Sequence, residues 1–361
     1  VNPNQATEAT FWKDEADFEL ALTSCYTPLK NALNGGYYGT RGVMMRIARA
    51  DEVEFRNDIS DVFQACYFTN TNGNSLSQGM FYQFYNALYR TNSIMQKLEE
   101  KQGEFGEDFV NKVKAECLFI RGFYLFQLGK EFKNAPLRLT ASQAEIWSQA
   151  EQDLLTAASL LPVKNDVIGK PTKGAAYAVL GKIYVYEEDF DKAIEIHSKA
   201  CDNANINSCY SIALMYYYGK GFKQNDIKAY EFFHRGCSLE DGNSCNQLAN
   251  MIYYGKGVKQ DYKNASEYYK KACDNNNLDS CLELANMYQK GEGVNQDYSK
   301  STEIFLKLCD KGFTKACHNL GFMYHQGYGI KQDYIKAREF FKKACDSNNF
   351  ASCLNLGIMY E

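Results

Sequence analysis

The apolar positions in the second half of the chain predict pairs of short amphipathic helices. A first helix is expected over about 244–254, where four apolar residues share one face at 3.6 residues per turn: Leu248, Ala249, Met251 and Ile252. A second helix is expected over about 262–273, with its own apolar stripe: Tyr262, Ala265, Tyr269 and Ala272. Gly255 directly follows the first helix and can adopt the left-handed conformation that ends a helix.

This helix pair recurs at a fixed step of 36 residues. G-x-G sequences stand at Gly219/Gly221, Gly255/Gly257, Gly291/Gly293 and Gly327/Gly329. Cysteines fall in five pairs, eight residues apart: Cys201/Cys209, Cys237/Cys245, Cys273/Cys281, Cys309/Cys317 and Cys345/Cys353. A fixed period of this length indicates a solenoid of stacked helix pairs. Because the G-x-G sequences recur four times and follow no strand, we interpret them as turns and not as nucleotide-binding loops.

The first 189 residues show helical spacing without this period. Apolar residues three or four positions apart occur in four stretches, each of which is predicted to be helical: 9–33, 84–98, 115–132 and 169–193. Lys170-Pro171-Thr172 is expected to be a loop that leads into small and aromatic residues, the packing pattern of tetratricopeptide repeats. Only 5 of 361 residues are proline and none follows Pro171, which favours long helical regions. The chain is therefore predicted to be an all-α solenoid.

The clustered cysteines predict disulfides, because five evenly spaced pairs do not converge as the four ligands of a zinc ion must. Disulfides imply an oxidising compartment. Cys273 and Cys281 flank the short connection from one helix pair to the next, where a bridge is geometrically easy. Cys245 lies at the same end of its helix pair as Cys273, so geometry alone leaves both pairings open.

The sequence CDNNNLDSCLELANMYQKGEGVNQDYSKSTEIFLKLCDKGFTKACHNLGFMYHQGYGI resembles the Sel-like repeats of the Helicobacter cysteine-rich protein family, and the resemblance covers about 190–361. It implies right-handed αα superhelices, a secreted or periplasmic location and one disulfide per repeat between cysteines eight residues apart. The bonded residues would be Cys201, Cys209, Cys237, Cys245, Cys273, Cys281, Cys309, Cys317, Cys345 and Cys353. Some family members bind or weakly hydrolyse β-lactams, but no catalytic motif for that reaction maps onto this sequence.

Residues 5–195 resemble the amino-terminal half of SusD/RagB-type outer-membrane glycan-binding lipoproteins, which contains tetratricopeptide repeats. The most specific shared elements are Arg90-x-Asn92, Glu116 with Arg121, Pro136, and the stretches 153–162 and 169–176. The resemblance implies binding of oligosaccharides such as starch fragments. Three departures are noted: a lipid-bearing cysteine and signal peptide are absent, the segment from Pro136 to Trp147 is short, and cysteine repeats replace the family's large carboxyl-terminal region.

The two resemblances meet in one predicted helix, Phe190–Cys201. Its sequence FDKAIEIHSKAC aligns with YKNASEYYKKAC at 262–273, twice 36 residues further on. We therefore expect a SusD-like region over 1–189 and a cysteine-rich solenoid over 190–361, with 190–201 shared. This seam and the departures above suggest the hypothesis that the chain is an engineered fusion. Both parent families imply an extracytoplasmic location: periplasmic, secreted or at the outer-membrane surface.

Comparison of the repeats separates core positions from variable positions on the first helices. Counted from the second cysteine of each pair, positions three, four, six and seven stay apolar or small, whereas positions two, five and nine vary and share one face. If the first helices line the inner wall, this face is a concave surface for peptides or partner proteins. The candidate residues are Gln247, Asn250, Tyr254, Glu283, Asn286, Lys290, Asn319, Phe322 and Gln326. The alternative is a solvated surface without a ligand.

The aromatic residues, the histidines and the cysteines outside the repeats add few candidate binding or catalytic residues. Trp12, Trp147 and the pair Tyr37/Tyr38 could stack on sugar rings, although core packing is the favoured interpretation of each. The four histidines are expected at the surface: His197, His234, His318 and His325. The three cysteines outside the repeats, Cys25, Cys66 and Cys117, follow no spacing rule. Cys117 is expected in the core.

Charge and motifs narrow the function classes. The net charge is −4, with 19 basic and 24 acidic residues in 1–189 and 21 and 20 in 190–361, so neither part has the basic excess that nucleic-acid binding requires. No apolar run approaches the ~20 residues of a membrane span. No catalytic, metal-binding or cofactor motif is recognised. We predict a non-catalytic scaffold or protein- and peptide-interaction module, with glycan binding by the first half and β-lactam binding or weak hydrolysis by the second as alternatives.

Overall fold

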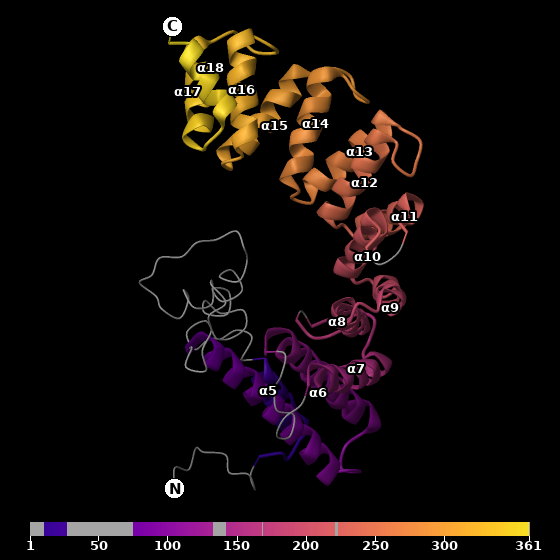
Figure 1. The fold of residues 1–361 in the computed structure, drawn as a ribbon. Helices are drawn as coiled ribbons and strands as arrows, with labels where there is room; N and C mark the ends of the chain where they lie inside the picture. Colours follow the sequence, from indigo (N-terminus) through magenta and orange to yellow (C-terminus); the bar gives the residue numbers. More distant parts are fainter. Residues whose placement is uncertain (1–10, 27–74, 133–141, 168, 221–222, 361) are drawn as a thin grey trace. The chain divides into compact units, whose positions relative to one another are not determined.

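The computed structural model describes residues 11–26, 75–132, 142–167, 169–220 and 223–360 (Figure 1). Within these ranges every regular element is an α-helix, which confirms the predicted all-α class. The chain divides into two compact units, 1–203 and 204–361. The helices of the first unit are α1 Glu15–Cys25, α5 Ser75–Glu100, α6 Glu107–Phe132, α7 Gln143–Leu160, α8 Lys173–Tyr186 and α9 Phe190–Asp202. Those of the second are α10 Ile206–Tyr218, α11 Asp226–Ser238, α12 Gly242–Tyr254, α13 Tyr262–Asp274, α14 Leu278–Lys290, α15 Tyr298–Asp310, α16 Thr314–Gln326, α17 Tyr334–Asp346 and α18 Phe350–Ile358.

In the first unit, each helix from α5 to α8 packs against its successor, and α1 packs on both α5 and α6. A capping box starts α7: the Ser142 hydroxyl accepts a hydrogen bond from the Glu145 N–H, and the Glu145 carboxylate accepts one from the Ser142 N–H. Large buried side chains such as Phe18, Phe84 and Tyr124 fill the space between the helices. This consecutive packing is the solenoid arrangement that the sequence predicts.

Buried polar contacts join helices of the first unit at residues that carry the SusD resemblance. Arg121 on α6 donates two hydrogen bonds of 2.7 Å to the Asp153 carboxylate on α7 and one of 2.9 Å to Asn92 on α5. Glu116, also on α6, accepts a hydrogen bond of 2.6 Å from the Lys170 ammonium. Both carboxylates are almost fully buried, so water screens these ion pairs little.

The stretch 169–193 was predicted to be one helical stretch after its loop, but it forms two helices with a tight turn between them. α8 ends at Tyr186 and α9 begins at Phe190, where the Asp189 side chain caps its first turn. Glu188 in the turn has a φ of 61°, in the left-handed region. No glycine or proline marks this turn, so the apolar spacing of 169–193 did not reveal it. The alignment with 262–273 did predict a helix that begins at Phe190, where α9 begins.

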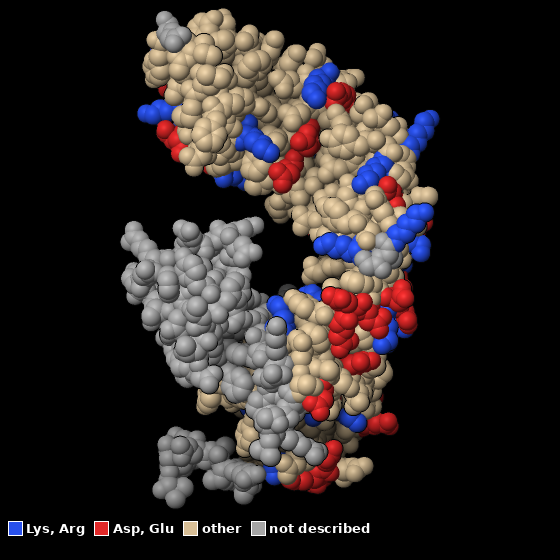
Figure 2. Space-filling view, viewed as in Figure 1, with Lys and Arg blue, Asp and Glu red and all other residues tan. Residues whose placement is uncertain are grey.

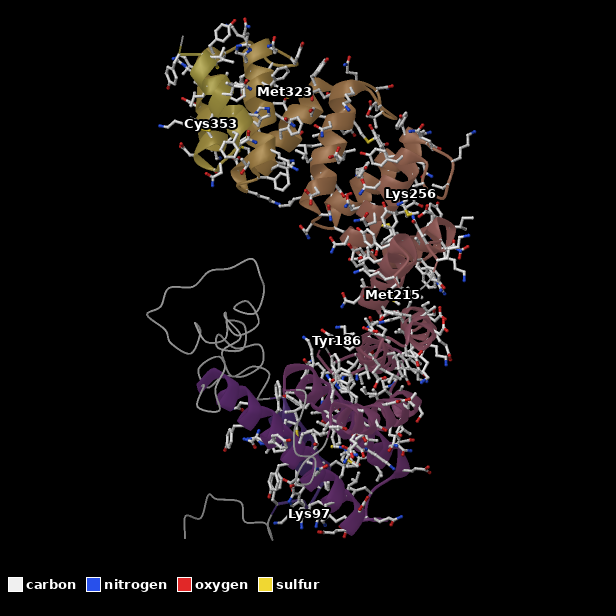
Figure 3. All side chains as sticks on the ribbon, viewed as in Figure 1. Lys97, Tyr186, Met215, Lys256, Met323 and Cys353 are labelled. Carbon is white, nitrogen blue, oxygen red and sulfur yellow. A yellow bond between two sulfur atoms is a disulfide. The ribbon has the colours of Figure 1, made fainter. Side chains whose placement is uncertain are left out.

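In the second unit, helix pairs repeat with the predicted period. Every helix from α10 to α17 has 13 residues and packs against the next one. An Asn or Asp side chain caps the first turn of each of them except α16, whose cap position is Phe313. Methionine also recurs at the 36-residue step, and four of these residues are buried: Met215, Met251, Met287 and Met323. Met215 and Met323 are labelled in Figure 3.

In the three G-x-G sequences that the structure describes in full, the two glycines have different roles. Gly255 has a φ of 68° and ends α12 as a left-handed cap, which confirms the predicted role, and the equivalent glycines end α10, α14 and α16. The second glycine lies against the start of the preceding second helix: a Cβ on Gly293 would lie 2.1 Å from the Tyr262 carbonyl oxygen. Only a residue without a side chain permits this contact, so the repeated motif is structural.

Four disulfides link neighbouring helix pairs in the second unit. They join Cys237 to Cys245, Cys273 to Cys281, Cys309 to Cys317 and Cys345 to Cys353, with Cα atoms 4.5–4.8 Å apart. Cys201 and Cys209 are each disulfide-bonded as well. The spacing of eight residues is the one that the family resemblance implied, and it differs from the alternative in which Cys245 bonds Cys273.

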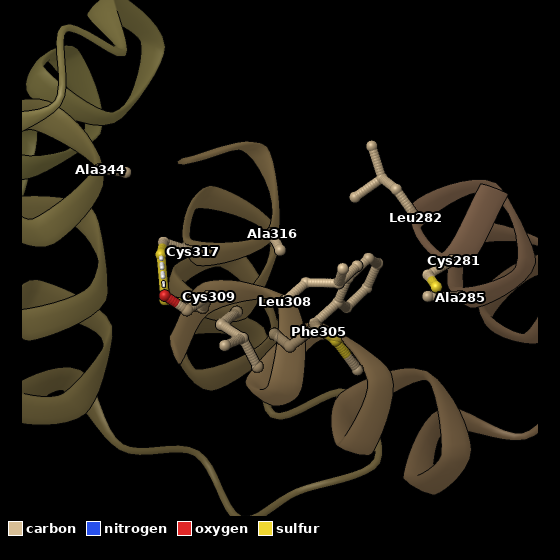
Figure 4. Packing of buried hydrophobic residues seen from close by; sticks show 11 residues of the cluster. Cys281, Leu282, Ala285, Phe305, Leu308, Cys309, Ala316, Cys317 and Ala344 are labelled. Atoms are coloured by element: carbon tan, nitrogen blue, oxygen red, sulfur yellow. Dashed lines mark hydrogen bonds between the residues drawn. A yellow bond between two sulfur atoms is a disulfide. The ribbon is translucent and has the colours of Figure 1, made fainter. Parts of the chain in front are cut away.

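The core beside each disulfide is formed by apolar side chains from consecutive helices. Figure 4 shows the cluster around Phe305 and Leu308 on α15, which pack with Ala285 on α14 and Ala316 on α16. Alanine at the facing positions lets the helices approach closely while the larger side chains fill the space between them. All four of these side chains are buried.

Candidate binding surfaces

The nine candidate residues of the predicted surface lie on the first helices of three successive pairs. We call them the first-helix face: Gln247, Asn250 and Tyr254 on α12, Glu283, Asn286 and Lys290 on α14, and Asn319, Phe322 and Gln326 on α16. None of the nine is buried, whereas neighbouring positions such as Leu248 and Met251 contribute to the core. The internal comparison of repeats thus separated exposed from buried positions on these helices.

Side-chain amides connect the first helices of neighbouring pairs. The Asn319 amide donates a hydrogen bond of 3.4 Å to the Asn286 oxygen, and the Asn277 amide donates one of 3.0 Å to the Asn243 oxygen. The Asn250 oxygen accepts a hydrogen bond of 2.6 Å from the Tyr269 hydroxyl. An amide whose oxygen is already bonded still carries two N–H donors, so Asn250 can bind a further acceptor.

The first-helix face is mostly uncharged. Glu283 and Lys290 are its charged residues, and Lys290 also lies 3.7 Å from the Glu292 carboxylate. Two aromatic side chains are open to solvent, with Tyr254 72% and Phe322 41% exposed. Amides can bond a peptide main chain, and exposed rings can contact its apolar side chains, so this composition suits an extended polypeptide.

A small apolar pocket lies between α1 and α5 in the first unit. Its volume is about 260 Å³, and its lining includes Trp12, Leu20, Ser24, Tyr89 and Ser93. The Trp12 ring packs edge-to-face on a buried phenylalanine, and its φ of 71° is rare for a residue with a side chain. The Tyr89 side chain is 73% exposed. Aromatic surface together with hydroxyl groups is a composition that can hold a small polar ring.

The other aromatic candidates do not join this pocket. Trp147 is buried in the core, and its indole N–H donates a hydrogen bond of 3.2 Å to the Phe126 carbonyl. It therefore serves packing, which was the favoured interpretation. Tyr37 and Tyr38 lie outside the described residues.

The expectation that all four histidines lie at the surface is wrong for His197. This side chain is 2% exposed on α9 and packs against Gly181 on α8, where a Cβ would lie 2.8 Å from the imidazole. Gly321 packs against Phe341 in the same way. His197 thus occupies the place of a core aromatic ring, and burial lowers its pKa to about 4. The 36-residue spacing carried a signal for this burial, because His197 aligns with Tyr269 and Phe341, which are core aromatic residues.

The two described free thiols are unsuited to nucleophilic chemistry. Cys25 and Cys117 are both buried, and Cys117 lies in the core as predicted. Burial raises the pKa of Cys25 to about 11 and that of Cys117 well above its ordinary value. Both therefore stay protonated near neutral pH, and the thiolate is the reactive form. Cys66 lies outside the described residues.

A polar cluster that the sequence reasoning did not assemble surrounds Glu116. Its carboxylate accepts a hydrogen bond of 2.8 Å from the Tyr26 hydroxyl in addition to that from Lys170, whose ammonium also lies 3.3 Å from Glu19. Burial lowers the pKa of Lys170, but the two carboxylates outweigh this effect and hold it above its ordinary value. Because every partner is already bonded within the cluster, it fixes helix positions. Glu116 was singled out as a motif residue, but its partners are distant in sequence.

The described part of the chain shows no metal centre. Within these residues no group of three or more His, Cys, Asp or Glu side chains is placed to hold a metal ion, and no helix is both long and apolar enough to cross a membrane. Figure 2 shows both basic and acidic side chains on the face that it draws, with acidic ones gathered near α8 and α9.

Comparisons with known proteins agree with the two halves seen in the sequence. A family model described as "Starch-binding associating with outer membrane" matches residues 4–185, which is half of the chain. A model of the Sel1 repeat matches five times, at 175–205, 206–241, 242–277, 278–313 and 314–349. The two models overlap within α8, and the first Sel1 match consists of the α8–α9 pair.

Three solved structures resemble parts of the chain. A SusD superfamily protein from Bacteroides vulgatus is 72% identical, with a TM-score of 0.51, over 53% of this chain and 43% of its own. A protective antigen of uropathogenic Escherichia coli with an SLR fold is 23% identical, with a TM-score of 0.54, over 73% of this chain and 51% of its own, which shows the fold alone. Cysteine-rich protein B of Helicobacter pylori is 32% identical, with a TM-score of 0.30, over 36% of this chain and 92% of its own.

This chain spans only about half the length of the first two of these relatives. Both matched families are of binding or scaffold type, and the description of the first associates its members with the outer membrane. Disulfides agree with an oxidising, extracytoplasmic compartment. The chain therefore belongs, through residues 4–185, to the SusD-like family described as starch-binding and associated with the outer membrane, and it continues into a series of Sel1 repeats.

Proposed function

We propose that this chain is a non-catalytic helical-repeat scaffold that binds a protein or peptide segment along the first-helix face of the second unit. The observation that carries the proposal is that all nine residues of that face are exposed or partly buried on three stacked helices, beside positions that form the core. A stack of equivalent helices presents its side chains at regular intervals, which suits a ligand that is itself extended.

The composition of the face suits an uncharged polypeptide segment better than a strongly charged ligand. Amides such as Gln247 and Asn250 can donate to main-chain carbonyls and accept from main-chain N–H groups. Tyr254 and Phe322 offer exposed rings for apolar side chains of the partner. Aromatic residues are enriched among those that dominate interface energies, so these two are the expected anchors.

Selection of peptides tests this function. A phage-displayed library of random dodecapeptides would be panned on the full chain, and the affinity of enriched peptides measured by fluorescence polarisation. The triple variant Tyr254→Ala, Lys290→Ala, Phe322→Ala is expected to weaken binding at least tenfold, because it removes the exposed anchors. A matched triple variant on exposed positions of the second helices, Lys263→Ala, Glu267→Ala, Glu339→Ala, is expected to bind normally. Failure to enrich any peptide, or equal losses in both variants, would contradict the proposal.

We further propose that the chain is an engineered fusion whose two repeat families share the helix 190–201. The overlap of the two family models shortly before this helix supports a common helical framework. The domain limits 1–189 and 190–361 remain part of this proposal. A single natural reading frame that runs unbroken across residues 185–205 would contradict it. As the cellular location we propose the periplasm, the exterior or the outer-membrane surface, where disulfides persist.

Glycan binding by the first unit is the second candidate function, and the pocket between α1 and α5 favours it. Trp12 and Tyr89 place aromatic surface there beside the hydroxyl of Ser93. The chain contains two tryptophans, so Trp147→Phe leaves Trp12 as the single indole reporter. Titration of that variant with maltoheptaose is expected to change the Trp12 fluorescence, and the further change Tyr89→Ala is expected to abolish the response. An unchanged spectrum at millimolar maltoheptaose would count against glycan binding in this pocket.

A further inference from the structure

A groove of about 390 Å³ lies among α13, α14 and α15 of the second unit. None of its lining residues belongs to the first-helix face, although α14 contributes residues to both surfaces. We call it the α15 groove. Its apolar lining includes Leu278, Leu284, Tyr288 and Ile304, all partly or fully buried. Its lining also includes four exposed lysines: Lys270, Lys300, Lys307 and Lys311. An apolar surface with several cationic groups around it suits a ligand that is apolar at one end and anionic at the other.

The repeats explain why the groove is open at this place. Two other tyrosines at the position of Tyr288 stack on a phenylalanine 16 residues later: Tyr216 on Phe232 at 5.8 Å between ring centres, and Tyr324 on Phe340 at 5.5 Å. Their ring planes are within 9° of parallel. The residue 16 positions after Tyr288 is Ile304. Isoleucine is a branched aliphatic residue without a flat ring, so the position that phenylalanine takes in those repeats holds no aromatic side chain beside Tyr288.

The charges around the groove are unbalanced toward the positive. Two carboxylates line it, and each is already paired within its own helix: Asp274 with Lys270 at 2.7 Å and Glu303 with Lys307 at 2.6 Å. The Lys300 ammonium lies 5.3 Å from the centre of the Tyr288 ring. The Lys300 ammonium also lies 3.4 Å from the Asp297 carboxylate. Four ammonium groups against these three carboxylates leave an excess of one positive charge around the groove, which would attract an anionic group.

We propose that the α15 groove binds a small aromatic carboxylate. The aromatic ring would stack on Tyr288 in the place that Phe232 and Phe340 take in the other repeats, and the carboxylate would pair with the surrounding lysines. This inference is independent of the peptide-binding function, because it concerns different side chains and a different class of ligand.

Binding of 2-naphthoate to the full, oxidised chain tests the proposal. The titration would be followed by isothermal calorimetry or by ligand-observed NMR, and a Kd on the order of 1 mM or tighter is expected for a ligand of this size in an open groove. The variant Ile304→Phe places in α15 the residue that two other repeats already have, so it is expected to fold normally. It would fill the stacking position and weaken 2-naphthoate binding at least tenfold. Unchanged affinity in Ile304→Phe, or no binding to the unmodified chain, would overturn the proposal.

The role of charge is tested separately. The uncharged analogue 2-naphthalenemethanol is expected to bind at least fivefold more weakly than 2-naphthoate. The variant Lys307→Gln, Lys311→Gln is expected to remove most of that difference, whereas Lys263→Gln, an exposed lysine of α13 outside the groove lining, is expected to preserve it. Equal affinity for the two ligands would show adventitious apolar binding and would overturn the assignment of an anionic ligand. Circular dichroism melting of each variant checks that the fold is retained.

Discussion

The two units stack their helices in the same way but hold them together by different means. In the first unit, buried ion pairs join residues that are distant in sequence, such as Arg121 and Asp153, which are 32 positions apart. These ion pairs do not repeat at a fixed spacing. In the second unit, disulfides between cysteines eight residues apart and glycine contacts repeat with every helix pair. A strict period therefore lets the same set of contacts stabilise every helix pair, whereas the unit without a period depends on specific polar contacts that each occur once.

Removal of the buried carboxylate should affect the first unit most strongly. Asp153→Ala leaves the Arg121 guanidinium without its partner in a largely buried place, and we expect the free energy of unfolding of the first unit to fall by about 3 kcal/mol. Guanidinium denaturation with hydrogen-exchange mass spectrometry would report each unit separately. Glu303→Ala, which breaks an exposed ion pair in the second unit, is the control and should leave stability nearly unchanged. Equal effects of the two variants would contradict the distinction between buried and exposed pairs.

Removal of one disulfide should affect the second unit alone. The double variant Cys273→Ala, Cys281→Ala opens a short covalent loop, and we expect it to lower the stability of the second unit by about 2–3 kcal/mol. The matched change in the first unit is Cys117→Ala, which removes a buried free thiol and should cost less than the loss of the disulfide. Unfolding followed with and without dithiothreitol provides the measurement. If the reductant lowered the stability of the first unit as much as that of the second, the claim that disulfides stabilise only the second unit would be contradicted.

Mild acid should destabilise the first unit through His197. Burial holds its folded-state pKa at about 4, below the unfolded value of about 6.5, so the unfolded chain binds more protons between these pH values. The contribution is fully present above pH 6.5 and is lost as the pH falls toward 4. We expect a loss of about 2 kcal/mol at pH 5.

The variant His197→Phe sharpens this prediction, because phenylalanine occupies the equivalent position, packed on a small residue, at Phe341. Its stability should be less dependent on pH between 7 and 5 than that of the unmodified chain. Denaturation at several pH values gives the comparison, and an unchanged pH dependence in the variant would exclude His197 as its origin.

The smallest expected effect concerns a contact that recurs within the second unit. Lysine lies over tyrosine in three repeats, with Lys336 5.3 Å from the Tyr324 ring centre, whereas the fourth has Ile252 and Asn264. The two positions therefore change together. In a double-mutant cycle of Tyr324→Ile and Lys336→Asn, we expect a coupling energy of about 0.5 kcal/mol, typical of an exposed cation–π contact. A coupling energy near zero would mean that the recurrence is not due to this interaction.

The sequence predicted more of the structure of the second unit than of the first, and the reason is physical. Because the second unit repeats, each position is sampled several times, and the invariant Gly255 position or the apolar Met251 position could be recognised as structural without coordinates. In the first unit each contact occurs once. The pairing of Arg121 with Asp153 has no periodic signature, and the turn at Glu188 lacks a glycine or proline to reveal it.

The candidate surfaces show the same limit. Variation among the repeats identified the exposed residues of the first-helix face, since a buried position tolerates few side chains. The α15 groove was not recognised, although Ile304 in place of an aromatic residue is visible in the sequence. That substitution becomes informative only when Tyr216 and Phe232 are seen to stack, which places the missing ring beside Tyr288.

The sequence by itself determined the helical class, the period of 36 residues, the glycines that end the first helices and the core positions of the repeats. Each of these follows from spacing along one helix or from the conformational freedom of a single residue, and such properties are local. Tertiary structure alone decided that Glu116 meets Lys170 and Tyr26 and that Ile304 leaves a groove. These outcomes depend on which side chains from different helices come within contact distance, and that is set by the packing of the helices together.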